Sequence, residues 1–321
     1  MKSLKEHAIN RNDNIAIAVV CGGSSSYAKL SRFTGQCIAD ALRVKYKKVE
    51  VLELDAMTGA NLKKTSVDVV FPALYGAPGE GGVLQGFLDV MKIPYVGSGA
   101  SASSRAMDRI STKRILSGYG LPVAKDVIVI RRKDLLLVAK HALDALGGDV
   151  IVKPSLHKSV QEFPLCSDAT TLEHAIEQAF AHGQRVLIEE RIQGREIKVG
   201  ILEGSEAKAL PVIEVQSSQS WLDFECMYTS GCQKHIIPAS LPDSQYRRTQ
   251  ELAIEAHRVL GCRDLSIVKF IVPDLGEPVV IEVKTMPGMT PTSLYAEAAK
   301  ADGISFEELV SHLIERALLR T

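Results

Sequence analysis

Residues 15–26 read IAIAVVCGGSSS, an unbroken apolar run that ends in a turn of glycine and serine. An apolar run of this length before such a turn is typical of a buried parallel strand that leads into a helix. Helical spacing over residues 32–43 follows, and further strand-like runs stand at residues 49–54 and 67–74. The alternation predicts an α/β fold with a parallel sheet, whose ligands bind at the carboxyl ends of the strands.

The rest of the chain continues this alternation of strand-like and helix-like segments. We predict further strands at residues 126–130, 150–152, 186–190, 196–202, 210–215, 266–272 and 279–283. Helical spacing over residues 134–146 and 306–318 predicts two helices, and the second carries its apolar residues on one face. At about 100–200 residues per domain, a chain of 321 residues is expected to form two or three domains.

Charge and composition exclude several classes of partner. Lys and Arg together number 38, and Asp and Glu also number 38, so the formal net charge is zero. Nucleic acids and anionic membranes attract a basic excess, so neither is an expected partner. No apolar run reaches the ~18 residues of a membrane span, and the polar N-terminus predicts a cytoplasmic location. The six cysteines form no CxxC pair, which predicts reduced thiols and no zinc site.

Seven motifs stand in order along the chain. They are LYGAPGEGGVLQGFLD at 74–89, IPYVG at 93–97, AMDRISTK at 106–113, VKP at 152–154, EERIQGREIKVG at 189–200, IPA at 237–239 and IEVKTMPGMTPTSL at 281–294. In this order and spacing they resemble the D-alanine–D-alanine ligase family of the ATP-grasp superfamily.

The resemblance implies a three-domain α/β fold. The expected domains are a Rossmann-like one over residues 1–110, a central ATP-grasp domain over 111–208 and a C-terminal ATP-grasp domain over 209–321. It also implies a homodimer, with ATP held between the second and third domains. The family joins two D-alanines through an acyl phosphate and uses Mg²⁺.

Four residues fall at the family's nucleotide-binding positions. By the resemblance, Lys153 contacts an ATP phosphate and Arg109 replaces the family's second basic residue. Glu189 falls at the adenine side and Glu196 where the ribose hydroxyls are held. For each, the alternative is an ordinary salt-bridge partner at the surface. The loop at 156–163 lacks the glycines that would bring backbone amides close to phosphates.

The family's metal ligands are largely replaced. Of the Asp, Glu and Asn that hold Mg²⁺ in the family, only Glu282 is kept, and Lys269 and Lys284 stand in the other two places. Divalent cations prefer oxygen ligands, and nearby ammonium groups repel them, so we predict no protein metal ligands and no standard two-Mg²⁺ site. Two interpretations stay open. Either the two lysines pair with Glu282, or they replace Mg²⁺ as fixed countercharges to a phosphate or another anion.

The substrate side is also altered. Ser293 and Tyr228 keep family positions, and with Lys269 and Lys284 they form the candidate catalytic set. The arginine that stabilises the family's oxyanion is Ile267 here, which offers no hydrogen bond. The carboxylate that receives the first ammonium group aligns with Tyr27, which carries no charge.

Three functional hypotheses follow. The first is a pseudoenzyme that keeps the fold to bind a small-molecule ligand, either a nucleotide or an amino acid. The second is an active ATP-dependent carboxylate–amine ligase with altered substrates and charge handling. The third is an ordinary D-alanine–D-alanine ligase. Turn-shaping residues persist while charge-handling residues are replaced, and this pattern favours the first hypothesis.

Overall fold

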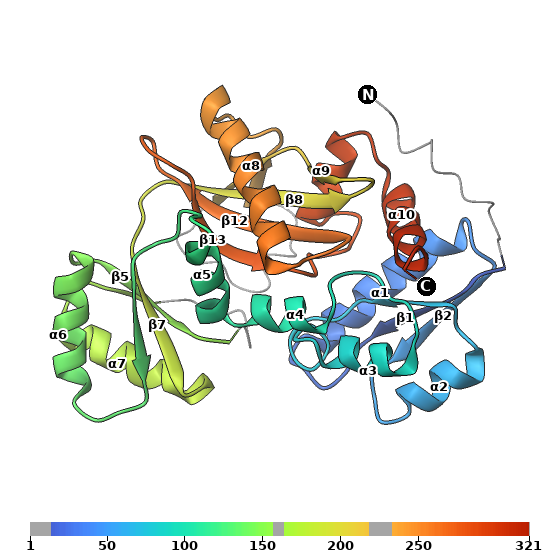
Figure 1. Cartoon of the computed structure of the whole chain (residues 1–321), viewed down its shortest axis with the longest axis horizontal. Coiled ribbons are helices and arrows are strands. Elements are labelled where there is room, and N and C mark those ends of the chain that lie inside the picture. The colour runs from blue at the N-terminus through green and yellow to red at the C-terminus, as the bar shows by residue number, and fades with distance from the viewer. Residues whose placement is uncertain (1–13, 157–163, 218–232, 321) are drawn as a thin grey trace.

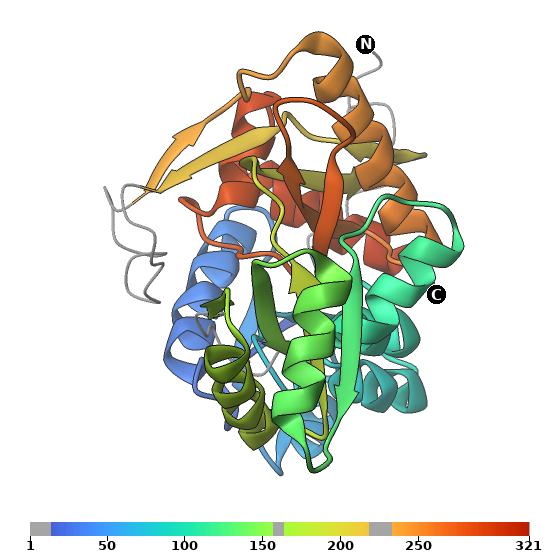
Figure 2. The ribbon, with the colours of Figure 1, turned by 90° about the vertical axis from the view of Figure 1, so that its left-hand side faces the viewer.

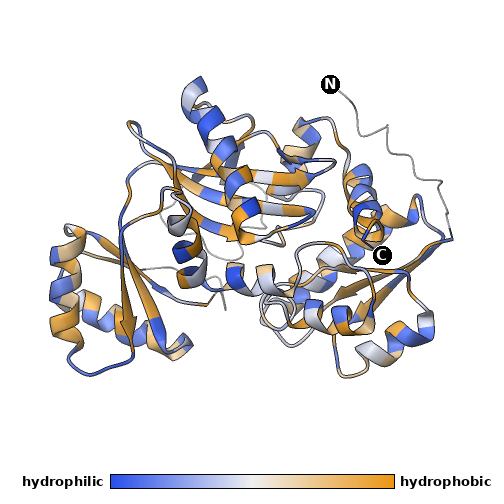
Figure 3. Ribbon diagram, in the orientation of Figure 1, coloured by the Kyte–Doolittle hydropathy of each residue, from blue (hydrophilic) through white to orange (hydrophobic). Residues whose placement is uncertain are grey.

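The computed structural model describes residues 14–156, 164–217 and 233–320. It contains three separate β-sheets, each covered by helices (Figure 1). The strands of all three sheets are mostly apolar, and the helices carry polar residues outward (Figure 3). The predicted mixed α/β fold with an N-terminal parallel sheet is confirmed.

The N-terminal sheet is the one that residues 15–26 predict. Its parallel strands are β1 (Ala16–Cys21), β2 (Lys48–Glu53) and β3 (Val69–Pro72), in the order β2-β1-β3. The accompanying helices are α1 (Ala28–Arg43), α2 (Thr58–Thr65), α3 (Val83–Met91) and α4 (Ala100–Met107). Alternate side chains of β1 enter two hydrophobic clusters, with Ile17 and Val19 in one and Ala18 and Val20 in the other. Burial on both faces explains the unbroken apolar run.

The central sheet is antiparallel, in the order β4-β7-β5-β6. This part of the chain comprises α5 (Arg109–Gly118), β4 (Asp126–Ile130), α6 (Leu135–Leu146), β5 (Val150–Pro154), β6 (Leu165–Cys166), α7 (Ala169–Ala179), η2 (Phe180–His182) and β7 (Arg185–Glu190). The helices α6 and α7 lie side by side over one face of the sheet (Figure 2). Their apolar side chains form one hydrophobic cluster with the inward residues of β5 and β7.

The C-terminal sheet has the order β11-β10-β8-β12-β13, with β9 paired to β8. Its elements are β8 (Arg195–Glu203), β9 (Ala207–Ala209), β10 (Ile213–Ser217), β11 (Gln233–Ile236), α8 (Asp243–Leu260), β12 (Leu265–Val272), β13 (Val279–Lys284), α9 (Leu294–Ala301) and α10 (Phe306–Leu318). The domain boundaries near 110 and 208 stay predictions. The strand β8 precedes the second boundary but hydrogen-bonds to β12 of this sheet.

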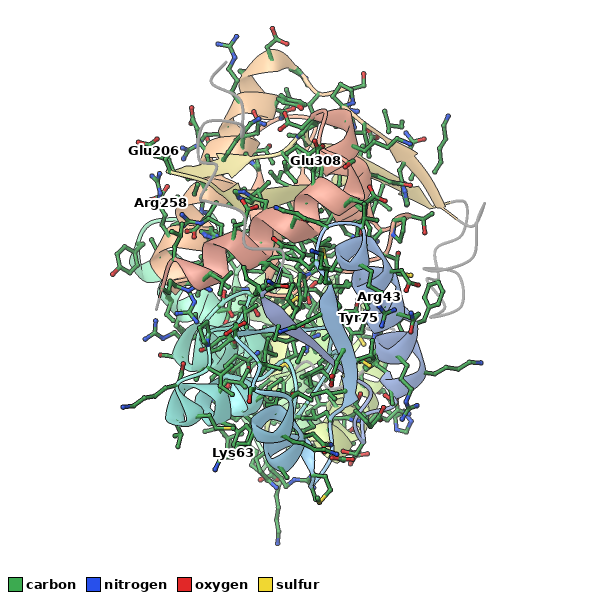
Figure 4. All side chains as sticks on the ribbon, turned by 90° about the vertical axis from the view of Figure 1, so that its right-hand side faces the viewer. Arg43, Lys63, Tyr75, Glu206, Arg258 and Glu308 are labelled. Carbon is green, nitrogen blue, oxygen red and sulfur yellow. The ribbon has the colours of Figure 1, made fainter. Side chains whose placement is uncertain are left out.

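The C-terminal sheet is joined to the N-terminal domain by a buried carboxylate. Asp264 is fully buried, and its Oδ2 accepts hydrogen bonds from Gly97 N at 2.7 Å and Arg320 Nη2 at 2.8 Å. The same guanidinium donates to Tyr95 O at 2.6 Å. The helix α10, which leads to Arg320, runs along the boundary between the two domains (Figure 4). The predicted apolar face of this helix is confirmed as buried.

A second, partly buried charge lies beside this junction, and it makes stability depend on pH. Burial alone would raise the pKa of the Glu203 carboxyl, but hydrogen bonds from His257 and Asp264 N, together with the charge of Arg316, lower it to about 2. A lowered folded-state pKa contributes stability that is present above the unfolded value of 4.5 and is lost as pH falls toward 2.

We expect the free energy of unfolding of the native chain to lose roughly 3 kcal/mol through this group between those limits. Urea unfolding of the native chain and of Glu203→Gln at several pH values measures this loss. The difference in free energy of unfolding between the two proteins should shrink as the pH falls. Glu206→Gln, at an exposed carboxylate on the edge of the C-terminal domain (Figure 4), is the matched control. A difference between native and Glu203→Gln that stays constant with pH would contradict the expectation.

Candidate functional site

A narrow cleft lies between the central and C-terminal sheets. It is lined by residues of α5, β7 and β13, with the charged side chains Arg109, Lys113, Glu189 and Glu282 among apolar ones. Two residues predicted for nucleotide binding, Arg109 and Glu189, therefore lie together with Glu282, the kept metal-ligand position, although the three span 173 positions of the sequence.

Glu189 stands at the centre of a buried ion-pair cluster. Its Oε1 is 2.5 Å from Lys113 Nζ, and its Oε2 pairs with Lys153 Nζ. All three residues are at most 7% exposed. Burial lowers the pKa of Lys153, and Glu189 opposes this shift. Burial acts to raise the pKa of the Glu189 carboxyl. The charges and hydrogen bonds of the two lysines outweigh burial, so this pKa is lowered. The alternative of surface salt-bridge partners is wrong for Lys153 and Glu189.

Lys113 was not predicted as a site residue, although the sequence carries a signal for it. Lys113 stands four residues after Arg109 on α5, so both lie on one face of that helix. A lysine one turn after a predicted phosphate contact could have been included.

Arg109 is held by the chain that follows Lys153. Its Nη1 donates to Pro154 O at 2.9 Å and to Leu156 O at 3.2 Å. Burial lowers the pKa of its guanidinium, and the negative charges of Glu282 and Glu189 act against this. Arg109 therefore holds the start of the loop at 156–163, the loop that the resemblance to the family places over the ATP phosphates. Residues 157–163 of that loop lie outside the described residues, so the expectation for it stays a prediction.

Three lysines gather on the side of the C-terminal sheet opposite α8. Along β8 the side chains of Ile197 and Val199 enter the core with α8, so Glu196 and Lys198 point to the other face. Lys269 lies directly opposite Lys198 across the β8–β12 pair.

The third lysine and the kept metal-ligand position lie on the next strand. Glu282 of β13 is opposite Lys269, and Lys284 follows two residues later on the same face. We call Lys198, Lys269 and Lys284 the lysine cluster. Lys198 was missed from the sequence, although its alternation with Glu196 on a strand places the two on one face.

The ion pairs of the lysine cluster involve Glu196. Lys269 Nζ is 2.8 Å from Glu196 Oε2, and Lys198 Nζ is 3.3 Å from Glu196 Oε1. The interpretation in which the two lysines pair with Glu282 omitted Glu196, whose carboxylate pairs with Lys269. A pair between Lys269 and Glu282, which lies directly opposite it, stays a prediction. Glu196 Oε1 is buried and accepts no hydrogen bond among the described residues. This oxygen can accept a hydrogen bond from a ligand hydroxyl.

The substrate-side candidates have structural contacts of their own. Ser293 caps α9, because its Oγ accepts from Ala296 N at 3.4 Å, and it also donates to Thr290 O at 2.8 Å. The hydroxyl of Tyr75 donates to Thr34 Oγ1 at 3.1 Å and accepts from Met289 N at 3.3 Å. Figure 4 labels Tyr75 in the N-terminal domain. Tyr228 lies outside the described residues.

Two family models match this chain. The model described as D-ala D-ala ligase C-terminus matches residues 115–315, and the one described as D-ala D-ala ligase N-terminus matches residues 53–98. The chain belongs to the D-alanine–D-alanine ligase family. The resemblance that the motifs carry is thereby confirmed.

Individual members of the D-alanine–D-alanine ligase family resemble the chain over nearly its whole length. The D-alanine–D-alanine ligase of Pelotomaculum thermopropionicum is 35% identical over 95% of this chain and 97% of its own length. That of Anaeromyxobacter sp. strain K is 38% identical over the same shares. The crystal structure of the Bacillus anthracis D-alanine–D-alanine ligase complexed with ATP is 30% identical, with a TM-score of 0.83 over 95% of this chain and 98% of that one.

These relatives bear on both the fold and the function. The predicted ATP-grasp fold is confirmed by the Bacillus anthracis structure, and D-alanyl-alanine synthetase A of Vibrio cholerae shows the same fold at a TM-score of 0.85. The relatives are named as D-alanine–D-alanine ligases, which gives no support to the pseudoenzyme hypothesis and fits the third hypothesis, an ordinary D-alanine–D-alanine ligase, best. Among the described residues, no helix is long and apolar enough to cross a membrane.

Proposed function

We propose that the chain is an ATP-dependent carboxylate–amine ligase that binds ATP in the cleft between the central and C-terminal sheets. The observation that carries this proposal is the buried cluster of Lys113, Glu189 and Lys153. Buried charges cost free energy, and they concentrate where a site needs them. The ATP complex of the Bacillus anthracis relative supports the choice of nucleotide.

The residues of the cleft have distinct roles in this proposal. Lys153 and Arg109 neutralise and orient the phosphates, while Lys113 and Glu189 hold Lys153 in place. Glu196 Oε1, which lies 3.3 Å from Lys198 Nζ, accepts a hydrogen bond from a ribose hydroxyl. A substrate carboxylate oxygen attacks the γ-phosphorus and ADP leaves. An amine then attacks the carbonyl carbon, the amide bond forms, and phosphate and a proton are released.

The lysine cluster does not supply the oxygen ligands that Mg²⁺ requires. Glu282 is the one carboxylate at the three family positions, and Lys269 and Lys284 fill the others. Among the described residues, no group of three His, Cys, Asp or Glu side chains is placed to hold a metal ion. The proposal therefore assigns no step to a metal ion at this face.

A second candidate is ordinary D-alanine–D-alanine ligation, which the names of the relatives favour. Two positions argue against it. Tyr27 offers no carboxylate to an ammonium group, and Ile267 lies among apolar side chains and offers no oxyanion donor. We therefore propose an acceptor amine or donor acid other than D-alanine. The homodimer and the cytoplasmic location stay predictions.

Release of ADP from ATP in the presence of single and paired amino acids tests the proposal. We expect amine-dependent ADP release by the native chain and an amide product by mass spectrometry. Lys153→Met removes a charged phosphate contact and should raise the Kd for ATP roughly 10- to 100-fold. Lys140→Met, at an exposed site on α6, should leave it unchanged. ATP binding without ADP release under any pair would favour the pseudoenzyme, and release with D-alanine alone would favour the second candidate.

A further inference from the structure

Among the described residues of its sheet face, the lysine cluster has more positive charges than there are carboxylates to offset them. Lys198, Lys269 and Lys284 share one face with two carboxylates, Glu196 and Glu282, on three adjacent strands. Lys198 and Lys269 are directly opposite each other in an antiparallel pair, where like charges destabilise the sheet. Their side chains are only 19% and 28% exposed, so water screens them weakly.

The pKa shifts on this face also show that its lysines repel one another. Burial lowers the pKa of Lys198, Glu196 acts to raise it, and Lys269 and Lys284 lower it further. Lys269 also contributes to lowering the pKa of Lys153 on the central sheet. Lys269 on the C-terminal sheet and Lys153 on the central sheet are therefore close enough for their charges to interact. A bound anion would relieve the repulsion among these groups.

We infer that the lysine cluster binds the phosphate groups of a nucleoside triphosphate directly and without a divalent cation. This inference rests on the nucleotide site of the proposed function. Lys269 and Lys284 stand at two of the family's metal-ligand positions, and Lys198 lies directly opposite Lys269, so fixed positive charge replaces oxygen ligands there. Lysine is an effective phosphate binder as a point charge. Metal-free ATP carries more negative charge than its magnesium complex, so this site should prefer the metal-free form.

The inference needs the ammonium groups to reach the ligand. Lys284 is exposed at the end of β13, next to the cleft residue Val283, and Lys269 is opposite Glu282, which lines the cleft. Phosphates bound by Lys153 on the central sheet would therefore lie between that lysine and the lysines of the C-terminal sheet, Lys269 and Lys284. Figure 1 shows β12 and β13 on the side of the C-terminal sheet that adjoins α5.

Calorimetric titration of the full chain tests the inference, with ATP and with inorganic tripolyphosphate as probes. Each titration is made in excess EDTA and again in excess MgCl₂. We expect ATP to bind at least as tightly in EDTA as in Mg²⁺, and tripolyphosphate to bind in EDTA. Added salt should weaken both, because the attraction is between charges.

Lys284→Gln is the informative variant, because Lys284 is exposed and its loss should spare the fold. We expect it to weaken metal-free ATP binding about tenfold. Lys208→Gln, on β9 of the same sheet and 63% exposed, is the matched control and should change nothing. Circular dichroism checks that both variants are folded.

The outcomes separate this inference from the proposed function. ATP binding that is tenfold or more tighter with Mg²⁺ would overturn the inference and leave the nucleotide site standing. Unchanged binding in Lys284→Gln would also overturn it. No ATP binding in either buffer would overturn both.

Discussion

The double variant Lys269→Asp, Lys284→Asn is expected to make ATP binding depend on Mg²⁺. It restores a carboxylate and an amide oxygen beside Glu282, and Lys269 and Glu282 are direct neighbours across β12 and β13. Oxygen ligands of this kind hold Mg²⁺ together with substrate phosphates. We expect Mg²⁺ to tighten ATP binding by about tenfold or more in the variant, which corresponds to ~1.4 kcal/mol. Calorimetry with and without EDTA measures it.

A control with the same change of charge separates a local effect from a general one. Lys48→Asp, Lys64→Asn alters two exposed lysines of the N-terminal domain and should bind ATP as the native chain does. The double variant at the cluster should still fail to ligate D-alanine, because Ile267 and Tyr27 are unchanged. Because catalytic groups that act as a unit have non-additive effects, replacing two of them does not restore activity while others are still missing. Vigorous D-alanine-dependent phosphate release would show that the rest of the site is intact.

The second large effect concerns the junction between the N-terminal and C-terminal domains. Asp264→Ala should lower the free energy of unfolding by about 3 kcal/mol or more, because it leaves the Arg320 guanidinium and Gly97 N without their buried partner. Urea unfolding measures this loss. Asp40→Ala removes the exposed pair between Asp40 and Arg43 on α1 and should cost under about 1 kcal/mol. Arg43 is labelled in Figure 4. Equal losses in the two variants would contradict the assigned role of Asp264.

The elements that were predicted well are those whose signal is local. The strand β1 follows from seven apolar residues before a glycine turn, and α10 from apolar residues at helical spacing. Membership of β8 in the C-terminal sheet depends on pairing with β12, which lies 62 or more residues later. No local pattern reports such a partner.

The candidate site shows the same limit. Arg109, Lys153, Glu189 and Glu196 were found because motifs mark them. Glu196 was not predicted as a partner of Lys269, because the two lie on different strands, 73 residues apart, and no local pattern links them. Likewise, sequence alone could not reveal that Glu189 bridges two buried lysines from α5 and β5.

A crystal structure of the chain with a non-hydrolysable ATP analogue and MgCl₂ tests the central claim most directly. We expect the phosphates to lie in the cleft, with Lys269 Nζ and Lys284 Nζ within ~3 Å of phosphate oxygens. Glu282 should hold no metal ion. An ordered divalent ion bound to a Glu282 oxygen at about 2.1 Å, with the lysines turned away, would contradict it.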